Sequence, residues 1–194
     1  MGVREEKNIL REKYKEIKAN ITDEQKQVLD EMVYNSFINS MSYKHCDSLI
    51  IYVSRKDEVD TLKIIQKALL DNKRVAVPKC IPHKIALEFY EIKNMSDLEK
   101  GHYGILEPNK DKCKKINPHF YSICIVPAIS FDIEGFRIGF GKGYYDRFLE
   151  KFEGLKIGIT YSLLITKKLP RGRFDQNIEL IVSEKGVKRV EKSH

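Results

Sequence analysis

Short runs of consecutive apolar residues alternate along this chain with stretches of helical periodicity. Clear examples of such runs are Leu49–Val53 and Ile123–Val126. A strand that is apolar at successive positions has to be buried on both faces, which is typical of a parallel sheet covered by helices. The alternation therefore predicts a layered α/β domain with a largely parallel sheet.

Each predicted element follows from its own local pattern. Thr22 followed by Gln25 fits a capping box that opens a helix, and Asp60 can cap a later one. An earlier helix is indicated by an apolar stripe at helical spacing, formed by Leu10, Tyr14, Ile17 and Ile21. The predicted strands are Ser48–Val53, Arg74–Val77 (ended by Pro78), Ala86–Ile92, Tyr121–Val126, Leu155–Thr160 and Glu179–Val182, and a last helix covers Tyr144–Phe152.

The size and charge of the chain restrict its organisation and its partners. Its 194 residues predict a single domain over residues 1–194, in which a helical N-terminal region of about residues 3–42 packs on the α/β core. The net charge is +7, but the 35 Lys and Arg residues are interleaved with 28 acidic ones. Interleaving is typical of a solvated surface. We therefore expect no nucleic acid and no membrane among its partners.

The location and the oligomeric state are predicted by default. The apolar runs are too short to span a bilayer, and the first residues are charged throughout, unlike a secretory signal. A cytoplasmic location is expected from these features. A self-contained domain of this size is expected to be a monomer.

The most informative segment is Val126–Leu149, which reads VPAISFDIEGFRIGFGKGYYDRFL. A predicted strand ends at its start, and Gly139, Gly141 and Gly143 lead directly into a predicted helix. Glycines at alternate positions let backbone N–H groups approach an anion without obstruction by a Cβ. A helix N-terminus adds partial positive charge that favours phosphate by about 0.3–1 kcal/mol. The segment therefore predicts a phosphate-binding loop.

Charged and aromatic residues around the glycines favour this prediction over a plain tight turn. Arg137 and Lys142 flank the glycines and can neutralise phosphate oxygens. Asp146 follows in the first predicted helical turn, where its carboxylate can hold magnesium against phosphates. Tyr144 and Tyr145 complete the group. The loop is not a Walker A motif, because GxxxxGK[ST] is absent from the sequence.

The run GFRIGFGKGYYD over residues 135–146 resembles the GxRxGxGxGYYD signature of 5-formyltetrahydrofolate cyclo-ligases. Weaker similarities to the same family are spread along nearly the whole chain in the same order. They are Lys7–Arg11 (K-x-x-L-R), Ser54–Thr61 (S-x(3)-E-x-[DE]-T), Gly104–Pro108 (G-I-x-E-P), Val126-Pro127, Phe131-Asp132 and Phe174-Asp175. At the last of these the family often has His before the acid, where this chain has Phe174.

The resemblance implies an ATP site. In the family the N-terminal Lys and Arg contact ATP, which corresponds to Lys7 and Arg11 here. Their i, i+4 spacing places both on one helical face, as a phosphate clamp requires, although the spacing alone would also suit a solvated face. The other ATP contacts that the resemblance implies are Arg137, Gly139, Phe140, Gly141, Lys142, Gly143, Tyr144 and Tyr145.

The resemblance also implies a folate site, a metal site and catalytic residues. Glu58, with Val53 nearby, corresponds to the family's substrate-contacting segment, and a carboxylate there can accept hydrogen bonds from the pterin. The remaining implied folate contacts are Phe140, Gly141, Lys142, Gly143 and Tyr144. The implied Mg²⁺ ligands are Asp146 and Asp175, and the residues expected to act in catalysis are Lys142, Arg137 and Tyr144.

The implied reaction explains why these residue types would occur together in one site. ATP phosphorylates the formyl oxygen on N5 of 5-formyltetrahydrofolate, and N10 closes the ring through an iminium phosphate to give 5,10-methenyltetrahydrofolate, ADP and phosphate. Such chemistry depends on positioning and charge stabilisation rather than on a protein nucleophile. A basic surface would also suit folates with a polyglutamate tail.

The resemblance further implies the fold of sugar-phosphate isomerases and CoA transferases (the NagB/RpiA/CoA transferase-like fold). This fold is an α/β fold with a three-layer open, largely parallel sheet and helices on both faces. Two alternative functions stay open at this point. One is an isomerase or CoA-transferase-like enzyme of the same fold, which leaves Lys7, Arg11 and Asp146 without a joint role. The other is a non-catalytic nucleotide- or RNA-binding module, for which the sequence lacks the usual motifs.

Overall fold

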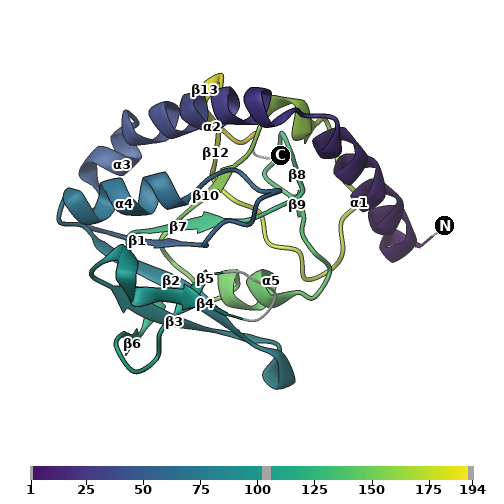
Figure 1. Ribbon diagram of the computed structural model, residues 1–194. Helices are drawn as coiled ribbons and strands as arrows, with labels where there is room; N and C mark the ends of the chain where they lie inside the picture. The colour runs from purple at the N-terminus through teal and green to yellow at the C-terminus, as the bar shows by residue number, and fades with distance from the viewer. Residues whose placement is uncertain (1, 102–105, 192–194) are drawn as a thin grey trace.

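A large mixed sheet forms the centre of the computed structural model, which describes residues 2–101 and 106–191 (Figure 1). Its strands are β1 (Ser48–Ile51), β2 (Arg74–Ile81), β3 (Ala86–Ile92), β6 (Lys114–Ile116), β7 (Ile123–Val126), β10 (Leu155–Ile159), β12 (Leu180–Ser183) and β13 (Gly186–Arg189). They are ordered β13-β12-β10-β7-β1-β2-β3-β6. The five from β12 to β2 run parallel, and β13, β3 and β6 are antiparallel additions at the edges. The prediction of a largely parallel sheet is confirmed.

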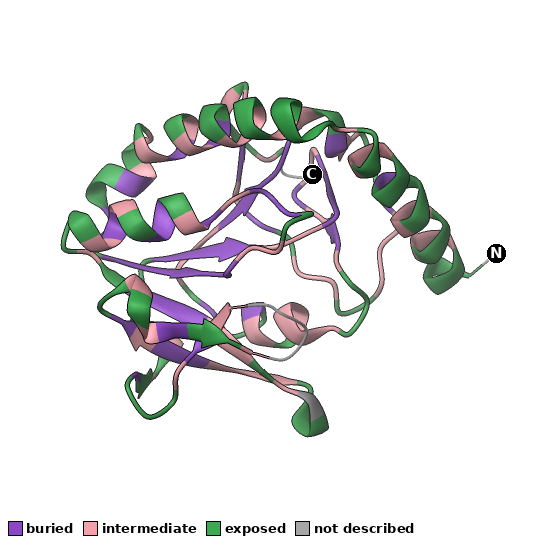
Figure 2. Ribbon diagram, in the orientation of Figure 1, coloured by how far each residue is buried: buried purple, intermediate pink, exposed green. Residues whose placement is uncertain are grey.

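Helices cover this sheet on both faces. They are α1 (Val3–Ala19), α2 (Asp23–Ile38), α3 (Met41–His45), α4 (Leu62–Leu70) and α5 (Tyr144–Leu149). Alternate residues of β1 face opposite sides: Leu49 and Ile51 join a core cluster that includes residues of α2 and α4, whereas Ile50 joins a cluster that includes Leu149 of α5. The central strands β1 and β7 are accordingly buried along their length (Figure 2). The further likeness to the isomerase and transferase fold stays a prediction.

Several short elements lie outside the main sheet. Strands β8 (Ser130–Asp132), β9 (Arg137–Ile138) and β11 (Ile165–Thr166) form a three-stranded sheet, and β4 (Leu98–Lys100) pairs with β5 (Leu106–Pro108). Single 3-10 turns occur at η1 (Pro82–Lys84), η2 (Met95–Asp97), η4 (Pro118–Phe120) and η5 (Ser162–Leu164). The small sheet of β8, β9 and β11 matters most for function, because β9 leads directly into the glycine-rich loop.

The N-terminal helices form as the sequence predicts. The Thr22 hydroxyl accepts a hydrogen bond from the Gln25 N–H at 3.2 Å, and the Gln25 side chain accepts one from the Thr22 N–H at 3.0 Å. This reciprocal pair is a capping box and begins α2. Helix α1 buries Tyr14, and Ile17 and Leu10 pack partly against the same core. Helices α1 to α3 occupy residues 3–45, and the single-domain organisation stays a prediction.

Several predicted boundaries are wrong, and β1, β7, β10 and β12 each begin or end one or two residues away from the prediction. Strand β2 continues through Pro78 to Ile81, because beyond Ala76 it pairs only with β3, and its other edge needs no N–H donor. Helix α4 begins at Leu62, although the Asp60 carboxylate still accepts a hydrogen bond from the Leu62 N–H at 2.8 Å. Helix α5 ends at Leu149 instead of residue 152. None of the helices in the described ranges combines the length and apolarity that a membrane crossing requires.

Candidate active site

The glycine-rich loop connects β9 to α5 and lies beyond the carboxyl ends of the central parallel strands. Open α/β sheets bind ligands at this edge. Gly141 and Gly143 adopt φ angles of +91° and +69°, which L-residues with a Cβ rarely adopt. Gly143 caps α5 in the left-handed conformation. With six residues, α5 is shorter than expected, so the loop N–H groups and nearby cations have to provide most of the attraction for an anion.

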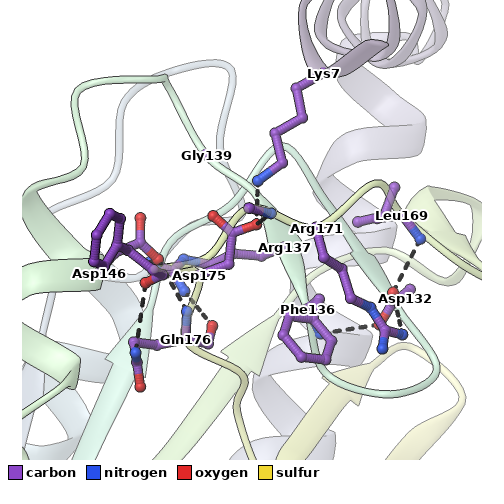
Figure 3. Close-up of polar contacts among 12 residues, drawn as sticks. Lys7, Asp132, Phe136, Arg137, Gly139, Asp146, Leu169, Arg171, Asp175 and Gln176 are labelled. Atoms are coloured by element: carbon purple, nitrogen blue, oxygen red, sulfur yellow. Dashed lines mark hydrogen bonds and ion pairs between the residues drawn. The ribbon is translucent and has the colours of Figure 1, made fainter. Parts of the chain in front are cut away.

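Arg137 fixes the acid at the start of α5. The Arg137 guanidinium is buried, with 7% of its residue surface exposed, and donates to Asp146 Oδ1 and to the Gln176 carbonyl, each at 2.8 Å (Figure 3). The Gln176 N–H donates to the same Asp146 oxygen at 3.3 Å. These bonds join β9, α5 and the segment before β12. Arg137 therefore positions Asp146, in addition to contributing positive charge.

Helix α1 brings two cations to the same loop. Lys7 forms an ion pair with Asp175 Oδ2, which also accepts a hydrogen bond from the Gly172 N–H at 2.7 Å (Figure 3). Arg11 Nε donates to the Gly139 carbonyl at 2.8 Å. Its guanidinium also lies against Gly141, where a Cβ would come within 3.3 Å of the Arg11 Cζ. Lys7 and Arg11 thus face the loop as a pair, as the resemblance implies.

A second group of residues faces the loop from the carboxyl end of β1. The Arg55 guanidinium stacks on the Phe140 ring, with 4.2 Å between Cζ and the ring centroid. The Arg55 N–H donates to Glu58 Oε2 at 2.9 Å. Burial raises the pKa of Glu58 above its usual value of 4.5, and the Arg55 N–H and guanidinium only partly oppose this effect. Val53 is buried just after β1. Glu58 and Phe140, both expected at the folate, are therefore linked through Arg55.

Lys142, Tyr144 and Tyr145 occupy different environments although they are close in sequence. Lys142 is exposed, and its positive charge partly opposes the effect of burial, which raises the pKa of Cys80 on β2. Lys142 therefore lies near β2. Tyr144 is partly exposed, whereas the Tyr145 hydroxyl is fully buried.

The carboxylate of Asp132 has a structural role that its family motif did not indicate. It is fully buried and accepts hydrogen bonds from the backbone N–H groups of Glu134 and Phe136 through Oδ1, and of Leu169 through Oδ2. Arg171 lies 3.6 Å from the same carboxylate and stacks on Phe136. These contacts hold the β8–β9 hairpin to the segment that leads toward Asp175 (Figure 3).

Asp146 and Asp175 satisfy the chemical requirements for magnesium. The hydrogen bonds to Asp146 fall on Oδ1 and those to Asp175 on Oδ2, so in the described part of the chain each carboxylate keeps its second oxygen for a ligand. No group of three or more His, Cys, Asp or Glu side chains within the described residues forms a complete metal site. Magnesium commonly uses one or two carboxylates together with phosphate and water oxygens. The two acids therefore fit a magnesium ion that is bound together with a nucleotide.

The structure brings most of the expected residues together around the loop. Sequence reasoning missed Arg55 and Gln176, which orient the expected residues through stacking and backbone contacts. The sequence indicated them only through their position, since each lies within four residues of an expected site residue. The similarity at Gly104 and Ile105 lies outside the described residues.

Comparisons with known proteins agree with this arrangement. A family model described as the 5-formyltetrahydrofolate cyclo-ligase family matches residues 3–184. A probable 5-formyltetrahydrofolate cyclo-ligase of Schizosaccharomyces pombe is 29% identical, over 76% of this chain and 79% of that protein. The 5-formyltetrahydrofolate cyclo-ligase of Haemophilus influenzae is 26% identical, over 86% and 91%.

Two solved structures are also similar to this chain. The NMR structure of the 5,10-methenyltetrahydrofolate synthetase of Aquifex aeolicus superposes with a TM-score of 0.84 at 32% identity, covering 97% of this chain and 94% of that one. The corresponding protein of Mycoplasma pneumoniae superposes with a TM-score of 0.74 at 22% identity, covering 92% and 98%, and supports the fold alone.

Proposed function

The chain belongs to the 5-formyltetrahydrofolate cyclo-ligase family and catalyses the ring closure that produces 5,10-methenyltetrahydrofolate, and we propose that ATP drives this reaction at the glycine-rich loop. The observation that carries the proposal is the convergence of Lys7, Arg11 and Asp146 on one loop, in which Gly141 and Gly143 have positive φ angles. Neither a sugar-phosphate isomerase nor an RNA-binding module needs that combination.

The cations hold the nucleotide. Lys7 and Arg11 extend from one face of α1, and Lys142 extends from the loop itself, so three positive side chains are available for the triphosphate. In the absence of the nucleotide Lys7 is paired with Asp175. A phosphate oxygen can replace that carboxylate as the partner of Lys7, because charge-assisted hydrogen bonds to phosphate are strong.

Asp146 and Asp175 would hold magnesium, whose charge neutralises the phosphate oxygens and makes the γ-phosphorus more electrophilic. Arg137 does not need to touch the nucleotide for this role. It fixes the orientation of Asp146 from behind, while the Gly172 N–H does the same for Asp175. Positioning of this kind is the main contribution of a protein to phosphoryl transfer.

The folate binds on the opposite side of the loop. Glu58 accepts hydrogen bonds from the pterin, and Phe140 and Tyr144 offer aromatic faces for stacking. The formyl oxygen is then directed at the γ-phosphate on the glycines. After its phosphorylation, N10 attacks the formyl carbon, and phosphate leaves as the ring closes.

A cavity next to the folate side suits a polyglutamate tail. It has a volume of about 330 Å³ and adjoins the loop that carries Glu58. Four lysines line it, namely Lys15, Lys18, Lys26 and Lys56, although acidic neighbours such as Asp57 and Asp23 partly neutralise them. We expect affinity to rise with the number of glutamates and to fall with salt. A cytoplasmic, monomeric protein remains the expectation.

The test is the absorbance of the methenyl product with purified protein, ATP, magnesium and (6S)-5-formyltetrahydrofolate. We expect growth of the methenyl band that requires both ATP and magnesium and is lost in Lys142→Ala. Folded protein that binds ATP but gives a flat trace would contradict the proposal. Growth of the band without ATP would contradict the assignment of ATP as the driving substrate.

A further inference from the structure

The Tyr145 hydroxyl is a buried polar group that has no hydrogen-bond partner within the described residues. Leaving a hydroxyl unpaired in a protein interior is unfavourable, because the group loses its hydrogen bonds to water and gains none in return. A phenylalanine would fill the same space without that cost. The hydroxyl therefore points to a partner that the chain alone does not supply.

The surroundings of the hydroxyl indicate which partner that is. Burial raises the pKa of Tyr145 well above its usual value of 10.0, and the nearby groups that raise it further are Cys124, Cys80, Glu58 and Tyr52. Cys124 belongs to β7 and Cys80 to β2, while Tyr52 and Glu58 follow β1. The hydroxyl thus lies near β7, near β2 and near the segment that follows β1.

Glu58 is the carboxylate among these neighbours, and it is the residue expected at the pterin. The Tyr145 side chain packs against the core cluster that includes Ile50 and Leu149, whereas Lys7 and Arg11 approach the loop from α1 and contact Asp175 and Gly139. The family resemblance placed Tyr145 with ATP, and the nearness of Glu58 favours the folate instead.

We propose that the Tyr145 hydroxyl hydrogen-bonds a polar atom of the bound folate and so determines affinity for the folate and not for ATP. This inference rests on the proposed function of the loop. A phenolic O–H can donate to a ring nitrogen or carbonyl oxygen, or accept from an N–H, and all three occur on a reduced pterin. The bond satisfies the hydroxyl only when the folate is bound.

The experiment is steady-state kinetics of Tyr145→Phe with each substrate varied in turn. Loss of one neutral hydrogen bond corresponds to about a 3- to 10-fold effect, so we expect the KM for 5-formyltetrahydrofolate to rise by that factor while the KM for ATP is unchanged. Calorimetric titration of the folate without ATP should show the same loss of affinity.

Thermal stability gives a second readout, and Tyr121→Phe is a matched control. The buried Tyr121 ring donates its hydroxyl hydrogen bond to Glu91 at 2.5 Å, near the start of β7. Tyr121→Phe should lower the Tm and leave both KM values unchanged. Tyr145→Phe should leave the Tm of the ligand-free protein unchanged or raise it, but reduce the increase in Tm that the folate causes.

Three outcomes would overturn the inference. Folate affinity equal to that of the wild type would mean that an ordered water satisfies the hydroxyl. A rise in the KM for ATP alone would place Tyr145 at the nucleotide. A lower Tm without folate would show that the hydroxyl is already paired within the protein. Absence of methenyl formation by the wild type would instead contradict the proposed function.

Discussion

Lys7 and Asp175 form an ion pair that joins the first helix to the segment before β12, although 168 residues separate them. Both side chains are mostly buried at this contact, and the Gly172 N–H fixes the carboxylate from the other side. Under the proposed function, the pair holds the cation expected at the nucleotide and the acid expected at the metal at one place. In this way α1 becomes part of the site.

Removing this cation should weaken ATP binding more than it weakens the fold. For Lys7→Ala we expect the KM for ATP to rise about 10-fold or more, since charge-assisted contacts contribute about 1.5–3 kcal/mol. The KM for folate should change little. The control is Lys13→Ala, an exposed lysine on the same helix. An unchanged KM for ATP in Lys7→Ala would remove Lys7 from the site.

Replacing the acid on α5 should act mainly on magnesium. Asp146→Asn keeps an oxygen for Arg137 but loses the negative charge, so we expect the magnesium concentration needed for half-maximal activity to rise about 10-fold or more. Glu150→Gln, an exposed change at the end of the same helix, is the control. Equal magnesium requirements in both variants would show that Asp146 holds Arg137 and not the metal.

The conformation of the loop can be tested with two glycines. Gly143 has a φ of +69°, whereas Gly139 has no positive φ, and a Cβ at either position would meet no atom within 4 Å. Gly143→Ala should therefore lower the free energy of unfolding by about 1–2 kcal/mol through backbone strain alone. Gly139→Ala should cost less. Chemical denaturation measures both, and equal losses would contradict this explanation.

Asp132 should contribute to the stability of the fold and not to substrate binding. Asp132→Asn turns an N–H donor toward Leu169 N–H or the hairpin N–H groups, so one accepted hydrogen bond is lost in a fully buried place. We expect the free energy of unfolding to fall by about 2–3 kcal/mol. The substrate KM values of the folded fraction should remain near those of the wild type. Asp111→Asn, in an exposed turn, is the control.

Glu58 should make the free energy of unfolding depend on pH in a direction that its pKa shift defines. Its pKa is raised by burial, so between 4.5 and the raised value the folded state binds more protons than the unfolded state. Stability then decreases as the pH rises through that window. In Glu58→Gln this decrease should be smaller, which denaturation at a series of pH values measures. A steeper decrease in the variant would contradict the assigned direction of the shift.

Local sequence patterns were sufficient to predict most of the helices and strands. The apolar runs predicted β1 and β7, and the capping box predicted the start of α2, because burial on both faces and helix capping each leave a signature within a few residues. Pro78 misled the prediction for β2, since tolerance of proline depends on whether the neighbouring edge is paired. Pairing is a property of the sheet and not of the local sequence.

The sequence by itself determined the family, the glycine-rich loop and the identity of its charged residues, since glycines and cations in that order suit few other chemistries. Only the tertiary structure determined which residues contact one another. It paired Lys7 with Asp175 and Arg137 with Asp146, and it buried the Tyr145 hydroxyl. These relationships depend on packing between distant segments, and contacts across 168 residues leave no pattern in a single sequence.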